Sequence, residues 1–130
     1  YCEVGWVEHK GFCYSFSPEV ASWLDAASVC QVYGGRLVQI ESQEKNDFIA
    51  AQMAHKHVED AWIGGTCRYH PSIWEWVPSL KPIRGYLNWF KGEPNSRKSQ
   101  AEQCMQIRKL HQYKWNDYPC LLLIRFICEK

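Results

Sequence analysis

Alternating apolar and polar residues predict a strand near the start of the chain. Residues 11–16, Gly-Phe-Cys-Tyr-Ser-Phe, are aromatic and alternating, and Ser17-Pro18 ends the run. Ser22 then stands as a candidate N-cap in front of a helix that Gly34-Gly35 stops. The apolar residues of this helix recur at helical spacing, at Trp23, Leu24, Ala26, Ala27, Cys30 and Tyr33.

The next segments repeat this order of strand and helix. Residues 37–40, Leu-Val-Gln-Ile, predict a short strand, and Ser42 predicts the cap of a second helix that runs to about Met53. Residues 61–63, Ala-Trp-Ile, follow as a buried strand that we expect Gly64-Gly65 to end.

The second half of the chain is less regular. Residues 66–103 are rich in aromatic side chains but hold only short strand-like runs such as 73–77, which predicts a long, ordered, irregular segment. Residues 105–107, 114–116 and 121–128 predict the closing strands of an antiparallel sheet. The pattern as a whole predicts an α+β fold.

Length and charge narrow the class of protein. A chain of 130 residues matches one domain, residues 1–130, with a single core. The formal net charge of +1 argues against a nucleic-acid partner, and no apolar run approaches the roughly 18 residues of a membrane span. The chain starts at Tyr1 without a methionine or a leader, so we expect a secreted protein whose signal has been removed.

Seven cysteines also point to an extracellular, oxidising compartment, where disulfides persist. A zinc framework is the weaker interpretation, because no Cys-x-x-Cys pair occurs and the cysteines lie far apart. Since seven is odd, at least one thiol must be free or joined to another chain.

Carboxylates and amides gather in the late half of the chain. Calcium takes roughly six to eight oxygen ligands from carboxylates, amide and backbone carbonyls, and water. Five side chains offer such oxygens, so they predict a calcium site with vacancies that two neighbouring sugar hydroxyls could fill. The five are Glu93, Asn95, Glu102, Asn116 and Asp117.

The order of these motifs resembles the C-type lectin domain over essentially the whole chain. The match rests on the cysteines at both ends, a helix with Cys30, Trp62-Ile63-Gly64-Gly65, Glu93-Pro94-Asn95 and Trp115-Asn116-Asp117. This resemblance implies a double-loop fold with two helices flanking two small antiparallel sheets. It also implies three disulfides, Cys2–Cys13, Cys30–Cys128 and Cys104–Cys120, which leave Cys67 as a free or interchain thiol.

The resemblance also assigns roles in the candidate site. Glu93, Asn95, Glu102, Asn116 and Asp117 would bind both Ca2+ and the sugar, and the Glu93–Pro94 bond would be cis. Glu-Pro-Asn resembles the pattern of mannose-type lectins, whereas galactose-type relatives usually read Gln-Pro-Asp. Tyr113 is a candidate for stacking on an apolar sugar face. Ser96, in place of an acid, indicates that an auxiliary calcium site is absent.

Other functions remain open at this point. A Cys67–His70 pair could suggest a thiol enzyme, but nothing else in the sequence supports one, so we expect no enzyme. The fold could instead serve a protein-binding or toxin-like module, or a galactose-type lectin. If Cys67 links two chains, a homodimer would present two weak glycan sites together, which suits microbial binding in innate immunity.

Overall fold

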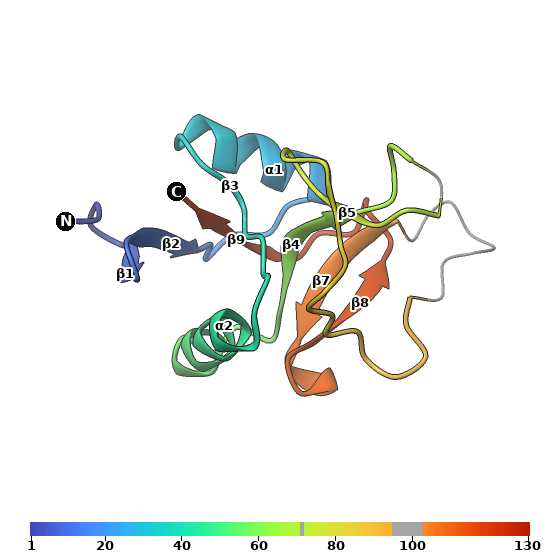
Figure 1. Cartoon of the computed structure of the whole chain (residues 1–130). Helices are drawn as coiled ribbons and strands as arrows, with labels where there is room; N and C mark the ends of the chain where they lie inside the picture. The colour runs from blue at the N-terminus through green and yellow to red at the C-terminus, as the bar shows by residue number, and fades with distance from the viewer. Residues whose placement is uncertain (71, 95–102) are drawn as a thin grey trace.

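The computed structural model of the chain describes residues 1–70, 72–94 and 103–130 and confirms the predicted α+β fold (Figure 1). The label η2 marks a single turn of 3-10 helix. In chain order the elements are β1 Val7–His9, β2 Phe12–Phe16, α1 Trp23–Val32, β3 Arg36–Leu37, α2 Gln43–His55, β4 Asp60–Thr66, β5 Glu75–Trp76, β6 Lys81–Pro82, β7 Cys104–Arg108, η2 Lys109–His111, β8 Lys114–Tyr118 and β9 Arg125–Glu129.

Both helices begin at the predicted caps. The Ser22 hydroxyl accepts a hydrogen bond from the Asp25 backbone N–H at 3.3 Å, and the Ser42 hydroxyl accepts one from Lys45 at 3.1 Å. Such caps satisfy backbone N–H groups that the first helical turn leaves without a partner. Gly34 follows α1 with a φ of 87°, a left-handed conformation that glycine adopts without penalty.

Strand β9 joins the two halves of the sheet. It pairs antiparallel with β2 and β3 and parallel with β4. The expected set of purely antiparallel strands is therefore wrong. Strands β4 and β9 are far apart in the sequence, so no tight hairpin forces them to run in opposite directions.

The strand limits also differ from those expected. Strand β4 continues through both glycines. A Cβ at Gly65 would lie 2.5 Å from Met105 Cε. Gly65 therefore serves a close approach and does not end the strand. In place of the expected strand over residues 37–40 the structure has β3 at Arg36–Leu37, and in place of the one over residues 121–128 it has β9 at Arg125–Glu129, while β1 and β6 were not foreseen.

The core consists of two apolar clusters. In one, Ile49 and Met53 of α2 are buried together with Ile63, Ile107 and Trp115 of the sheet. In the other, Trp23, Ala26 and Cys30 of α1 are buried with Trp62 and Phe126. Helix α1 thus covers the sheet by part of its predicted apolar spacing, while Leu24 and Tyr33 of the same spacing are exposed.

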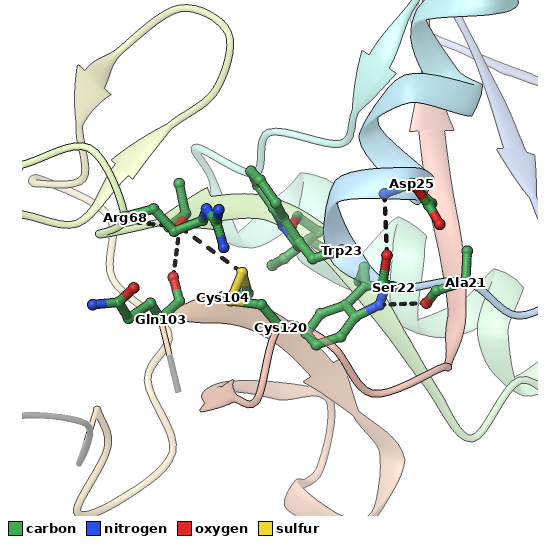
Figure 2. The surroundings of a disulfide bond; sticks show 11 residues. Ala21, Ser22, Trp23, Asp25, Arg68, Gln103, Cys104 and Cys120 are labelled. Atoms are coloured by element: carbon green, nitrogen blue, oxygen red, sulfur yellow. Dashed lines mark hydrogen bonds between the residues drawn. A yellow bond between two sulfur atoms is a disulfide. The ribbon is translucent and has the colours of Figure 1, made fainter. Parts of the chain in front are cut away.

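The three expected disulfides are present. Their Cα–Cα distances are 5.7 Å for Cys2–Cys13, 5.4 Å for Cys30–Cys128 and 5.2 Å for Cys104–Cys120. Figure 2 shows that the Cys104–Cys120 bond lies near the start of α1, beside Trp23. It holds the beginning of β7 to the segment that follows β8.

Candidate functional site

Strand β8 carries two of the five predicted calcium ligands. Asn116 and Asp117 are 5% and 3% exposed, and they directly follow Trp115, which is fully buried. The Trp115 indole N–H donates to Asn46 Oδ1 on α2 at 3.0 Å. The Asn46 Nδ2 donates in turn to the Tyr113 carbonyl at 3.1 Å. Helix α2 therefore fixes the start of the strand that presents Asn116 and Asp117.

The segment that leads to Glu93 runs beside this strand. Trp115 donates its backbone N–H to the Asn88 carbonyl at 2.9 Å and accepts a hydrogen bond from the Phe90 N–H at 2.8 Å. A turn follows, and a 2.8 Å hydrogen bond from the Glu93 N–H to the Phe90 carbonyl closes it. Glu93 therefore lies just beyond the segment that is hydrogen-bonded to β8, the strand of Asn116. The Glu93–Pro94 peptide bond is cis, as the family resemblance implied.

A buried oxygen of Asn116 has no hydrogen-bond partner among the described residues. Asn116 donates from Nδ2 to the Asp117 carbonyl at 3.0 Å, but its buried Oδ1 accepts no hydrogen bond from any residue that the structure describes. A buried acceptor in this state destabilises a fold by about 1–3 kcal/mol. An amide oxygen beside a carboxylate is the kind of donor set that Ca2+ prefers. These residues therefore fit the predicted ion.

The structure covers the predicted set only in part. Asn95 and Glu102 lie outside the described residues, so the described set is Glu93, Asn116 and Asp117. Within the described ranges, no group of three or more His, Cys, Asp or Glu side chains could by itself hold a metal. The candidate site accordingly depends on amide oxygens as well as carboxylates.

Tyr113 lies at the other end of β8 from Asp117. Its ring packs partly buried against the apolar cluster that includes Trp115 and Ile49. Asp117 lies four positions after Tyr113, with three residues of β8 between them, so the two are about 13 Å apart at the usual rise per residue of a strand. Its stacking on a sugar stays a prediction.

Two residues that sequence reasoning missed support the loop of Glu93. Asn88 is buried, donates from Nδ2 to the Tyr113 carbonyl at 3.2 Å, and accepts from Lys114 Nζ at 3.2 Å. The His111 ring stacks on Phe90, with centroids 4.0 Å apart. Loss of hydration, and secondarily the charge of Arg108, lower the pKa of His111. No local sequence signal marks either role, because each partner lies far along the chain or in a loop.

The remaining cysteine lies inside the domain. Cys67 takes part in none of the three disulfides and is 6% exposed, while its backbone N–H donates to the Gln103 carbonyl at 3.1 Å. His70 Nδ1 lies 2.8 Å from Glu75 Oε1. The imidazole is thus engaged with a buried carboxylate.

The fold and the three disulfides are those of a lectin-type domain, and comparison with known families agrees. Residues 19–130 match the family model described as the Lectin C-type domain, so the chain belongs to the C-type lectin family. Members of this family are binding domains and not enzymes, as the sequence predicted.

Similar proteins include a perlucin-like protein and a receptor. The chain is 35% identical to a perlucin-like protein of Mytilus galloprovincialis, over 92% of this chain and 76% of that one. It is 34% identical to asialoglycoprotein receptor 2 of Homo sapiens, over 99% of this chain but only 40% of the receptor. The chain therefore spans less than half the length of that receptor.

Solved structures give the same result for the fold. The carbohydrate-recognition domain of the human scavenger receptor C-type lectin superposes with a TM-score of 0.89 at 31% identity, covering 100% of this chain and 98% of that one. A Ca2+-dependent type II antifreeze protein superposes with a TM-score of 0.86 at 28% identity, covering 99% and 98%. Within the described residues, neither helix has the length and apolar character to cross a bilayer.

Proposed function

We propose that this domain binds Ca2+ through Glu93, Asn95, Glu102, Asn116 and Asp117 and binds a glycan through the coordinated ion. The observation that carries the proposal is the Asn116 Oδ1, a buried oxygen that accepts no hydrogen bond from the described residues and lies next to Asp117. Membership of the C-type lectin family, a carbohydrate-recognition fold, supports the same function.

Each side chain would have a distinct task. Bound Ca2+ would supply a positive centre that coordinates two vicinal sugar hydroxyls. The carboxylates Glu93 and Glu102 would accept hydrogen bonds from those hydroxyls, and the Asn95 and Asn116 amides would donate to them. A sugar whose hydroxyls do not match this pattern would leave polar groups without partners, which is how the site would discriminate.

We further propose a mannose-type preference, because this chain reads Glu93-Pro94-Asn95 and not Gln-Pro-Asp. Tyr113 could add a stacking contact with the sugar. The disulfides support an extracellular place of action, and secretion is the form that we propose.

Affinity chromatography tests this function. We expect retention on immobilised mannose in calcium, weaker retention on immobilised galactose, and release by a chelator. Asn116→Ala should lose retention on mannose, whereas Gln52→Ala, which removes an amide from α2, should keep it. Equal retention of the native protein with and without chelator would refute the calcium mechanism, and stronger retention on galactose would refute the sugar preference.

The sequence also predicts a homodimer in which Cys67 links two chains. Two Cα atoms must come within roughly 7 Å for such a bond, and Cys67 is only 6% exposed. The link would therefore need the chain around Cys67 to move outward. We propose that Cys67 stays inside its own domain and that pairing of two glycan sites, where it occurs, uses other contacts.

A further inference from the structure

Gln106 is a buried polar residue in the middle of β7. Its side chain is fully buried, and neither Oε1 nor Nε2 forms a hydrogen bond with any residue in the described part of the chain. Its neighbours Met105 and Ile107 are buried and apolar. A buried carboxamide without partners destabilises a fold, so an apolar residue would suit the packing better.

The sheet register places this carboxamide beside the candidate site. Gln106 is paired with Asn116 of β8 on one side and with Trp62 of β4 on the other. Side chains at paired positions lie on the same face of a sheet, with Cβ atoms about 5 Å apart. The Trp62 indole N–H already donates to the Ala21 carbonyl at 2.8 Å. Of the two residues paired with Gln106, Asn116 is therefore the one with a polar group available, because its Oδ1 is also unpartnered among the described residues.

We propose that Gln106 is a positioning residue for the calcium site, an inference that rests on the proposed function. When calcium binds, rotation of the side chain would let the Gln106 Nε2 donate a hydrogen bond to one lone pair of Asn116 Oδ1, whereas without calcium both groups stay unpartnered among the described residues. The other lone pair of Asn116 Oδ1 then faces the ion, and the amide is held in the orientation that coordination needs. An amide oxygen has two lone pairs, so both contacts are possible at once. Because its side chain is fully buried, Gln106 acts through Asn116 and not on the sugar.

The test compares two buried glutamines. Gln106→Met keeps the length of the side chain and removes its polar atoms. Gln39→Met is the matched control, since Gln39 is 2% exposed but its Oε1 accepts a hydrogen bond from the Ser79 hydroxyl at 3.0 Å. Calcium affinity is measured by calorimetry without sugar, and thermal unfolding is measured in chelator.

The two variants should behave in opposite ways. We expect Gln106→Met to weaken calcium binding about 10-fold, the low end of the range for residues that orient metal ligands, and to melt in chelator at the same or a higher temperature than the native protein. Gln39→Met should melt lower and bind calcium as the native protein does.

Several results would overturn the proposal. Unchanged calcium affinity in Gln106→Met would show that its carboxamide does not orient Asn116. A lower melting temperature in chelator, reproduced by Gln106→Leu, would show a role in folding alone. A change confined to mannose affinity at saturating calcium would show a direct sugar contact instead. If the native protein binds no calcium, the proposed function itself fails, which is a different outcome.

Discussion

Asn46 shows how a single side chain outside the motif supports the candidate site. It is 3% exposed on α2, and its amide both accepts from the Trp115 indole at 3.0 Å and donates to the Tyr113 carbonyl at 3.1 Å. Trp115 lies in β8 directly before Asn116, and Tyr113 directly precedes the strand. Hydrogen bonds across such a distance in the sequence fix one element against another, so their loss should be felt at the site.

We therefore expect Asn46→Ala to lower the free energy of unfolding by about 1–3 kcal/mol, because the buried indole N–H of Trp115 loses its partner. Calcium affinity should fall too, since β8 loses its tie to α2. Gln52→Ala on the same helix should change stability by less than about 0.5 kcal/mol. Chemical denaturation and calorimetric titration measure both quantities. A variant with native stability and native calcium affinity would contradict this role.

At this scale the sequence marks candidate ligands but not the residues that support them. Glu93, Asn116 and Asp117 stand out because carboxylates and amides occur in short motifs. Asn46 and Gln106 do not stand out. Their neighbours in the fold, Trp115 and Asn116, lie 69 and ten residues away in the sequence, and only the folded sheet brings them near. Their burial could not be deduced from residue type, since Asn and Gln are usually exposed.

Among the elements, β8 carries two of the described candidate ligands, Asn116 and Asp117, and a disulfide ties the segment after it to β7. The Cys104–Cys120 bond spans 16 residues and the Cys2–Cys13 bond spans 11, so the chain-entropy model assigns each about 3 kcal/mol of stability. The two disulfides lie in different parts of the fold. Cys13 lies in β2, which does not pair with β8.

Replacing each pair by alanine should separate stability from calcium binding. We expect both double variants to lose about 3 kcal/mol in the free energy of unfolding. Only the Cys104/Cys120 variant should also bind calcium more weakly, because the end of β8 is no longer held to β7. Denaturant titration and calorimetry of the two variants side by side check this. Equal calcium affinities would mean that the hydrogen bonds of the ladder suffice to hold the strands.

Local signals explain which elements the sequence could predict. Both helices were predicted to within about two residues, because Ser22 and Ser42 cap them and apolar spacing marks the first. The direction of β4 against β9 was predicted wrongly, because a parallel pair of distant strands leaves no local trace. The extent of β4 was also wrong, because glycine marks a turn and a close approach equally well.

For the whole molecule, the arrangement of elements separates the site from the chain ends. The termini lie on the side away from β7 and β8 (Figure 1). A segment attached at either end would therefore leave the candidate glycan site accessible. Cys67, in contrast, follows β4 directly, and its backbone bonds to Gln103, the residue before β7. A link through Cys67 would consequently join two domains close to their candidate calcium sites.

Burial of Cys67 decides whether such a link forms. At 6% exposure, the side chain offers little surface to a thiol reagent or to a second chain. We expect the native protein to run as a monomer on non-reducing electrophoresis, and its one thiol to be labelled slowly in buffer and fully in denaturant. Cys67→Ser should run identically. A dimer band that disappears with reductant, and that Cys67→Ser lacks, would instead confirm the covalent homodimer that an odd number of cysteines suggests, and would require the chain around Cys67 to open in solution.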